Sequence, residues 1–188
     1  MNGKEYLIEL TNAQFPVIPT IETLDSLDKL PNVETYIVKP KDGADSIGLE
    51  FVTKDELLDK FDPESKNTLV HPFINFEYEV SFYFIDKEFQ YALYAPDKEQ
   101  RWELKEYSPT EEDLTFANKF IEWNNLDWGI QRVDACRNEQ GELLLVELED
   151  LNPYLSLLEL SNETLKNFVE AMKKSLLKTL QLKFEFFL

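Results

Sequence analysis

The sequence has very few of the side chains on which many catalytic centres depend. It contains one cysteine, Cys136, and one histidine, His71, in 188 residues. A single cysteine excludes a disulfide within the chain and fits a reducing, cytoplasmic environment. A single histidine argues against a zinc site built from several histidines and against a serine–histidine–aspartate hydrolase. We therefore interpret Cys136 as a small buried side chain, the commoner role of a free cysteine.

Positive charge is scarce as well. The chain has 19 Lys and Arg against 37 Asp and Glu, a net charge of −18. This charge predicts no binding to nucleic acid, whose phosphates require basic side chains, and none to anionic membranes. There is no apolar run of membrane-spanning length and no signal-peptide pattern. A small nucleotide remains compatible with the charge, because a metal ion and a few lysines supply positive charge locally.

Apolar and aromatic side chains are plentiful. The hydrophobic fraction is 43%, with 14 Phe and 8 Tyr, enough for a real core. The length predicts one domain or two small lobes that share a cleft. Periodicity predicts helices at 4–13, 21–30, 53–61, 108–125 and from 161, and strands at 33–39, 49–52, 68–74, 78–86, 89–94, 133–137 and 142–149. Thr20, Ser108 and Ser161 are the expected N-caps of three of these helices, and 180–188 is expected to be a strand or a tail.

The stretch that begins at Arg132 has the pattern of two strands joined by a polar turn, and its second strand ends in Glu147-Leu148-Glu149. It predicts a hairpin closed around Gly141. Strand alternation places Glu147 and Glu149 on one face, and the hairpin brings Asp134 beside Glu147. Three such carboxylates repel one another unless a hard cation such as Mg²⁺, which prefers oxygen ligands, binds them. The alternative is that the two glutamates simply lie on the solvated face of an edge strand.

Two of the five glycines occur in one loop between predicted strands, from Lys39 to Gly48. The loop also contains Gly43 and Ser46. A Gly/Ser loop between strands offers backbone N–H groups to phosphates, and the lysine adds positive charge. The alternative is an ordinary hairpin turn with a surface lysine.

Several of these motifs, in this order, resemble the ATP-grasp superfamily, the fold of D-alanine–D-alanine ligase and bacterial glutathione synthetase. Residues 2–20, which end in FPVIPT, resemble the opening lysine, helix and Gly-x-Pro-x-Pro-x-Thr of that family. YIVKPKDGADSIG at 36–48 is similar to its Lys-Pro-x-x-Gly phosphate loop. VHPFINFEYEVSF at 70–82 resembles the hinge strand that leads to a Glu-x-Ser. Residues 132–153 resemble the Arg-x-Asp hairpin and the metal strand, and their Glu-Leu-Glu is most similar to glutathione-synthetase-like proteins.

The resemblance implies an α+β fold of two lobes with antiparallel sheets that hold a nucleotide between them. The N-terminal lobe would be 1–79, with the phosphate loop and hinge, and the C-terminal lobe 80–188, with the metal site. ATP and Mg²⁺ would be the cofactors. ATP would be contacted by Lys4, Lys39, Gly43, Ser46 and Gly48 at the phosphates, by the backbone of Phe73 and Ile74 at adenine, and by Glu79 at the ribose. Mg²⁺ would be held by Asp134, Glu147 and Glu149.

The implied activity is a carboxylate–amine or carboxylate–thiol ligase. ATP would phosphorylate a small carboxylate substrate, and the amine or thiol would attack the acyl phosphate, while Lys39 and Arg132 offset the developing charge. Residues 98–107, with Arg101 and Lys105, are either a lid over the phosphates or a solvated loop. Two other functions stay open: a nucleotide-binding module without ligase turnover, and an acidic interaction protein that binds no nucleotide.

Three features depart from the family pattern. Pro72 stands where many members have an acidic residue, and Glu149 stands where many have Asn. Family enzymes usually carry a further N-terminal domain before the first lysine. The chain is therefore expected to be a truncated form, one part of a split enzyme, or a reduced protein, and a homodimer partner or a separate N-terminal subunit is a candidate to cover the sheet edge.

Overall fold

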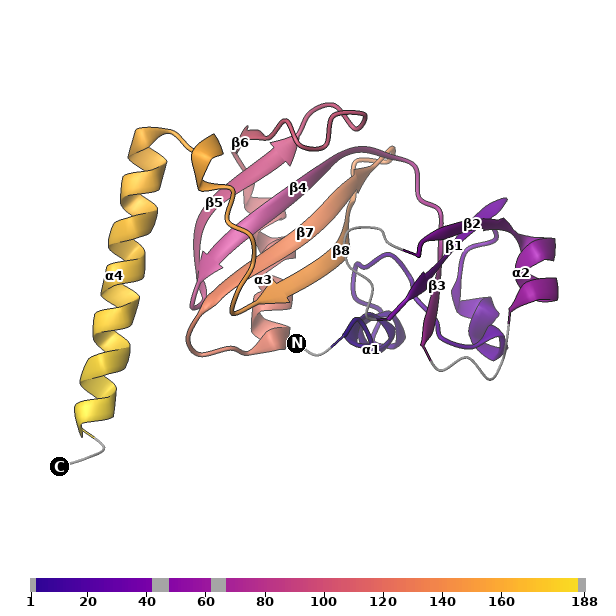
Figure 1. Ribbon diagram of the computed structural model, residues 1–188, viewed down its shortest axis with the longest axis horizontal. Helices are drawn as coiled ribbons and strands as arrows, with labels where there is room; N and C mark the ends of the chain where they lie inside the picture. The colour runs from indigo at the N-terminus through magenta and orange to yellow at the C-terminus, as the bar shows by residue number, and fades with distance from the viewer. Residues whose placement is uncertain (1–2, 42–47, 62–66, 186–188) are drawn as a thin grey trace. The chain divides into compact units, whose positions relative to one another are not determined.

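The computed structural model describes residues 3–41, 48–61 and 67–185 (Figure 1). The chain divides into two compact units, Met1–Asn75 and Phe76–Leu188. The boundary expected from the sequence, between residues 79 and 80, falls inside the first strand of the second unit. Each unit is described by itself below.

The first unit is built on a three-stranded antiparallel sheet in the order β2-β1-β3. Its elements are α1 (Tyr6–Asn12), the 3-10 helix η1 (Leu24–Lys29), β1 (Thr35–Pro40), β2 (Glu50–Thr53), α2 (Lys54–Lys60) and β3 (Thr68–Pro72). The prediction of an α-helix at 21–30 is wrong, because this segment forms a 3-10 helix that begins only at Leu24. Ile21 instead pairs with Val70 of β3, which leaves only the following residues free to turn. Thr53 caps α2 in a capping box with Glu56, at the start of the helix expected at 53–61.

The two faces of this sheet differ in what they carry. One face holds Tyr36, Val52 and Val70, which are buried in a cluster with Ile21 and Leu57. Residues paired across antiparallel strands point to the same side. The opposite face therefore carries the residues of the alternate register: Phe51, Ile37 and His71 at one level, then Lys39 beside Leu69.

The second unit is built on a five-stranded antiparallel sheet in the order β6-β5-β4-β7-β8. Its elements are β4 (Phe76–Ile85), β5 (Glu88–Ala95), β6 (Lys105–Tyr107), α3 (Glu111–Asn124), β7 (Ile130–Asn138), β8 (Leu143–Asp150), the 3-10 helix η2 (Leu157–Glu159) and α4 (Asn162–Glu185). The predicted hairpin around Gly141 is confirmed as β7 and β8. Ser161 caps α4, since its Oγ accepts from the Thr164 N–H at 3.2 Å.

Three local expectations for this unit are wrong. The segment 98–107 is not loop throughout, because Lys105–Tyr107 pairs with β5 as an edge strand. Helix α3 begins two residues later than expected, because Thr110, not Ser108, forms the capping box with Asp113. Residues 180–185 continue helix α4 instead of forming a strand or tail. Within the described ranges, no helix combines the length and apolarity that crossing a membrane requires.

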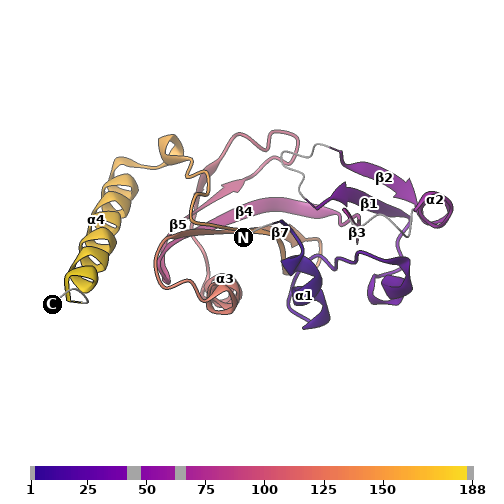
Figure 2. The same cartoon turned by 60° about the horizontal axis from the view of Figure 1, so that its bottom comes forward.

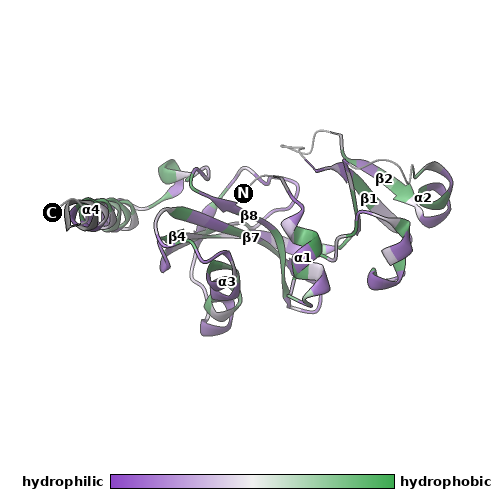
Figure 3. Ribbon diagram, turned by 90° about the horizontal axis from the view of Figure 1, so that it is seen from below, coloured by the Kyte–Doolittle hydropathy of each residue, from purple (hydrophilic) through white to green (hydrophobic). Residues whose placement is uncertain are grey.

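Helix α3 covers one face of the five-stranded sheet, as Figure 2 shows with the sheet seen nearly edge-on. It buries Phe116, Phe120 and Ile121 on its inner side and carries both hydrophobic and hydrophilic residues (Figure 3). On the other face, Tyr83 and Tyr91 pack against Phe168 of α4 and cover only one end. That second face also carries Ser81, Asp134 and Arg132, with Glu147 and Glu149 opposite the last two.

Candidate functional site

The acidic face is produced by a β-bulge in β8. Asp134 of β7 pairs with Glu147, but the register shifts at the next pair, where Leu145 is the partner. Val146 is therefore an extra residue in β8, and it reverses which side chains of the strand face the core. As a result, Leu145 and Leu148 are both buried, although they are three residues apart. Glu147 and Glu149 therefore point to the opposite face. A regular strand would have turned Glu147 toward the same side as Leu145.

Arg132 is the centre of this face. Its Nη2 lies 2.8 Å from Asp134 Oδ2 and 2.9 Å from Glu149 Oε1. Its Nη1 donates to the backbone carbonyl of Tyr154 at 3.0 Å. Burial lowers the pKa of the guanidinium, but the charges of Asp134 and Glu149 outweigh it and leave the pKa above its ordinary value. The arginine is thus a permanent cation shared by two carboxylates.

Asp134 is held from two sides. Its Oδ1 accepts from the Ser81 hydroxyl at 2.6 Å, and its Oδ2 accepts from Arg132 Nε at 3.0 Å. Ser81 lies directly opposite Asp134 in the pairing of β4 with β7. Ser81 was not a predicted site residue, although it is the serine of the Glu-x-Ser motif. Its contact fixes the orientation of Asp134.

Among the described residues, no group of three or more Asp, Glu, His or Cys side chains is arranged to hold a metal ion. Asp134, Glu147 and Glu149 are neighbours on two strands, and Arg132 is bound to the first and the last. Their donor chemistry fits Mg²⁺, which takes carboxylate oxygens. Ligation would require Asp134 and Glu149 to share or exchange their contacts with the guanidinium. The ligand set stays a prediction.

Glu79, the predicted ribose contact, is bound by an arginine. Arg101 donates from Nε to Glu79 Oε2 at 2.6 Å and from Nη2 to Oε1 at 2.8 Å, a bidentate pair. Burial raises the pKa of Glu79, and the charge of Arg101 opposes that rise. The sequence suggested that Arg101 reaches phosphates. In this structure it instead holds the residue expected to contact the sugar.

In the first unit, Lys4 and Lys39 lie close enough to His71 to act on its ionisation. Burial is the main cause that lowers the pKa of His71 to about 3, and the charges of both lysines add to it. His71 is only 8% exposed. Its Nδ1 lies 3.3 Å from the carbonyl of Pro72, and its Nε2 has no hydrogen-bond partner among the described residues. His71 was not a predicted site residue.

The predicted phosphate loop is described only in part. Gly43 and Ser46 lie outside the described residues. Gly48 has a φ of +77°, and a Cβ at this position would meet the ring of Pro40 at 3.3 Å. Both facts favour glycine there.

Lys41, the second lysine of this loop, is a structural residue. It is buried, and its Nζ donates to Glu5 Oε1 and to Glu22 Oε2, each at 2.8 Å. These two carboxylates raise its pKa above the ordinary value. The loop thus starts from an ion-paired anchor, which sequence inspection did not reveal because its partners are 36 and 19 residues away.

The predicted hinge residues Phe73 and Ile74 follow β3 directly. The N–H of Phe73 donates to the carbonyl of Thr35 at 3.0 Å, so this donor is already used within the unit. The Phe73 ring is 43% exposed and meets the ring of Phe51, itself 60% exposed, edge to face at 5.9 Å. Two exposed aromatic rings in contact provide an apolar surface on the face of Lys39.

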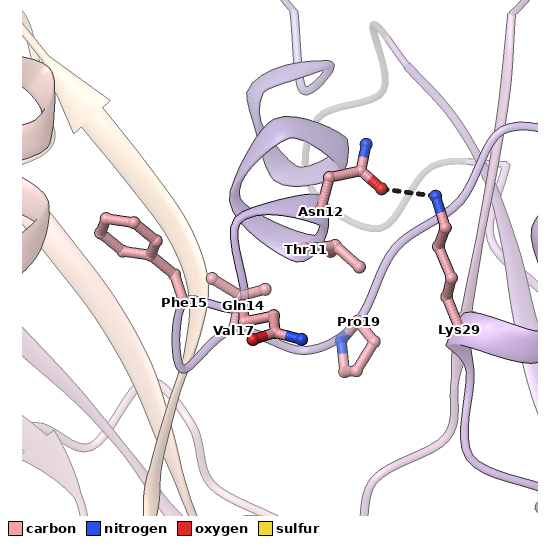
Figure 4. A pocket seen from close by; sticks show the side chains of 7 residues that line it. All are labelled: Thr11, Asn12, Gln14, Phe15, Val17, Pro19 and Lys29. Atoms are coloured by element: carbon pink, nitrogen blue, oxygen red, sulfur yellow. Dashed lines mark hydrogen bonds between the residues drawn. The ribbon is translucent and has the colours of Figure 1, made fainter.

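A groove of about 680 Å³ also occurs in the first unit (Figure 4). Its lining residues are Thr11, Asn12, Gln14, Phe15, Val17, Pro19 and Lys29. The side chains are neutral apart from Lys29, whose Nζ donates to Asn12 Oδ1 at 2.6 Å. None of the predicted site residues lines this groove, and its single lysine is already engaged. We do not assign the nucleotide to it.

Comparison with known proteins gives structural similarity only. No protein-family model matches the sequence, and no curated protein matches it. D-cycloserine synthetase DcsG is similar with a TM-score of 0.69 and 18% identity, over 92% of this chain and 69% of that one. D-alanine–D-alanine ligase from Bacillus anthracis, complexed with ATP, is similar with a TM-score of 0.65 and 16% identity, over 96% of this chain and 67% of that one.

The ATP-grasp ligase PsnB, complexed with a variant of its minimal precursor, Mg and ADP, is similar with a TM-score of 0.61 and 16% identity. The match covers 81% of this chain and 50% of PsnB. The chain has the ATP-grasp fold, and the predicted α+β class with two antiparallel sheets is confirmed. At these identities the similarity shows the fold, and activity has to be argued from the side chains.

Proposed function

We propose that this chain is the ATP-binding core of a ligase that joins a carboxylate to an amine or a thiol through an acyl phosphate. The observation that supports the proposal most is the acidic face, where Arg132 binds Asp134 and Glu149, and Glu147 lies opposite Asp134 in the sheet. Similar structures include ligases complexed with ATP or with Mg and ADP. A chain of net charge −18 needs such a local arrangement to attract a metal-bound triphosphate.

The carboxylates supply the metal-binding function in this proposal. Asp134, Glu147 and Glu149 would hold Mg²⁺, which when bound neutralises charge on phosphate oxygens. Arg132 would then give up part of its contact with Asp134 and Glu149 and donate to the phosphoryl group instead. Its role is to stabilise negative charge as it develops during transfer. Ser81 keeps Asp134 oriented during this exchange, because it binds the oxygen that Arg132 does not use.

The remaining residues would bind the nucleotide. Lys4 and Lys39 add positive charge for the phosphates, and the Gly43–Gly48 loop adds backbone N–H groups. The backbone of Phe73 and Ile74 would contact the base. Glu79 would accept from the ribose hydroxyls once Arg101 releases it, since both of its oxygens are bound by that arginine.

Two measurements on the full chain test the proposal. Calorimetric titration with ATP, with and without Mg²⁺, tests binding, and ADP release in the presence of a panel of carboxylates and amines tests turnover. Magnesium-dependent binding followed by ADP release that requires both substrates is the expected result. Binding without turnover would support a non-catalytic nucleotide module. No heat and no thermal shift with Mg-ATP would contradict both and leave an acidic interaction protein.

A further inference from the structure

Helix α4 is attached to the rest of the second unit by one of its sides. Phe168 is 4% exposed and packs edge to face on the ring of Tyr91. Further along the helix, Ser175 Oγ donates to Asp86 Oδ1 at 2.9 Å. Residues seven positions apart lie on the same side of an α-helix, so these two contacts define the side of α4 that faces its own sheet.

A second side of α4 carries apolar side chains that are open to solvent. Val169, Leu176 and Leu180 are 39%, 57% and 53% exposed, and Leu165 is half-buried. We call these four residues the apolar row. Because they occupy positions i, i+4, i+11 and i+15, they fall within about 60° around the helix and extend over about 22 Å of its length. Such a row, on a helix that already packs by another side, indicates a surface that contacts a protein.

The spacing of the apolar row is the same in both directions along the helix. Its first two members are four residues apart, as are its last two, and seven residues separate the two pairs. The row is therefore symmetric about a point between residues 172 and 173. Two antiparallel copies of α4, related by a twofold axis at that point, bring every member of one row against a member of the other. An isologous contact between identical chains requires this self-complementarity.

The charged groups near the midpoint of the row are also complementary to themselves. Lys173 Nζ binds Glu170 Oε1 of the same helix at 2.7 Å. In two antiparallel helices these ion pairs run in opposite directions, so each lysine lies within one helical turn of the glutamate of the other copy.

The net charge of α4 differs from that of the other residues. Residues 162–185 contain five Lys and three Glu, whereas the other residues have 14 Lys and Arg against 34 Asp and Glu. Like charges repel, and most of the negative charge lies outside this helix. Two copies of so acidic a chain therefore repel each other least where they meet through α4.

We propose that α4 is a dimerisation helix, which packs antiparallel against α4 of a second copy of this chain. Leu165 of one copy then packs against Leu180 of the other, and Val169 packs against Leu176, on both sides of the twofold axis. The contact removes from water apolar side chains that are exposed in the single chain. The inference does not depend on the proposed function, because none of the predicted nucleotide or metal residues lies on α4.

Sedimentation velocity of the full chain over a wide range of concentration tests the dimer, and we expect a monomer–dimer equilibrium. Leu176→Gln should weaken dimerisation by about tenfold or more, because the twofold axis repeats the lost contact. Leu58→Gln is the matched control and should leave the equilibrium unchanged, since Leu58 is 53% exposed and lies on α2. Circular dichroism verifies that both variants are folded. A monomer at every concentration, a dimer that Leu176→Gln does not weaken, or equal weakening by the two variants would overturn the inference.

Disulfide cross-linking tests how the two helices are aligned. The native cysteine, Cys136, is buried and leaves the surface free for this test. Val169→Cys and Leu176→Cys proteins, mixed in the presence of oxidised glutathione, should form a mixed disulfide, because the two positions face each other in the dimer. Val169→Cys alone should cross-link far less, because its two thiols lie seven residues, or about 10 Å, apart along the helix axis, beyond the reach of a disulfide. Equal cross-linking in the mixture and in Val169→Cys alone would contradict the antiparallel arrangement.

Discussion

The two faces of the five-stranded sheet each carry an arginine–aspartate pair, and the two pairs have different surroundings. On the face covered by α3, Arg137 Nη2 binds Asp113 Oδ1 at 2.5 Å, with side chains 17% and 4% exposed. Asp113 also accepts from the Tyr107 hydroxyl at 2.9 Å and from the Thr110 N–H at 3.0 Å. Every contact of this aspartate serves the start of α3 and its attachment to the sheet.

On the other face, Arg132 is shared between Asp134 and Glu149, and Glu147 lies opposite Asp134. The side chain of Glu149 is 34% exposed, whereas that of Asp113 is 4% exposed. A buried pair of one arginine and one aspartate has a structural role, because neither side chain can release the other without leaving an unpaired buried charge. On this face one guanidinium binds two carboxylates, which are 19% and 34% exposed, and a third carboxylate lies opposite the first, so these carboxylates can exchange the guanidinium for another cation. The comparison teaches that the number and exposure of the carboxylates separate the functional pair from the structural one.

The largest effect is expected from breaking the structural pair. Asp113→Ala leaves Arg137 buried without its partner and removes the capping box of α3, so we expect a loss of roughly 3–5 kcal/mol in unfolding free energy. Urea denaturation measures it. Glu111→Ala, in the same first turn but exposed, is the matched control and should lose less than about 1 kcal/mol. Equal losses in the two variants would contradict the assignment.

The pKa of Asp113 predicts how the loss of unfolding free energy in Asp113→Ala depends on pH. Burial raises the pKa of Asp113, but the bonds from Thr110, Arg137 and Tyr107 outweigh it and hold the pKa below its ordinary value of 3.8. A carboxyl group whose pKa is lower in the folded than in the unfolded state stabilises the fold at pH above its unfolded pKa. This contribution is lost as the pH falls through the folded pKa. The difference between wild type and Asp113→Ala should therefore be constant from about pH 8 to pH 5 and shrink below about pH 4. A difference in unfolding free energy that shrinks as the pH rises would contradict this role of Asp113.

Glu147→Gln tests the functional face. We expect a loss on the order of 10²–10³ in ADP release and weaker Mg-ATP binding, because one metal ligand loses its charge. Unfolding free energy without Mg²⁺ should stay within about 0.5 kcal/mol or rise, since a like charge opposite Asp134 is removed. Calorimetry and denaturation report the two quantities separately, with exposed Glu112→Gln on α3 as the control. Unaltered affinity and rate in a folded variant would refute the metal-ligand role.

A smaller effect is expected for Lys39→Ala in the first unit. Loss of one charged contact to phosphate should weaken Mg-ATP binding by about tenfold or more, measured by calorimetry. Lys54→Ala is the control, because Lys54 lies in the same unit and binds Asn32 at its surface. If both lysine variants bind Mg-ATP as the wild type does, Lys39 has no part in phosphate binding.

The smallest effect is expected for Arg101→Ala. Its pair with Glu79 is half exposed at the arginine, so the unfolding free energy should change by less than about 1 kcal/mol. Releasing Glu79 for the ribose should strengthen ATP binding by no more than about fivefold. A clear loss of affinity would instead favour Arg101 as a lid residue that binds phosphate. Lys105→Ala on β6 distinguishes this from a general effect of charge.

Structural features that depend on neighbouring residues in the sequence were predictable. The alternation in β7 and β8 predicts the hairpin and the common face of Glu147 and Glu149, and periodicity predicts the helix at 53–61 that is found as α2. The start of α3 was missed by two residues, since Ser108 and Thr110 both resemble an N-cap. Only the position of Asp113, which also binds Arg137, decides between them.

The sequence by itself determined the order of strands and helices and the kind of side chain on each strand face, because alternation and capping are local interactions. Only the tertiary structure decided which charges meet. Ser81 reaches Asp134 across 53 residues, and the bulge in β8 turns Glu147 away from the core. It also decided that His71 Nε2 is buried without a hydrogen-bond partner in the part of the chain that the structure describes, since burial depends on segments that are distant in the chain.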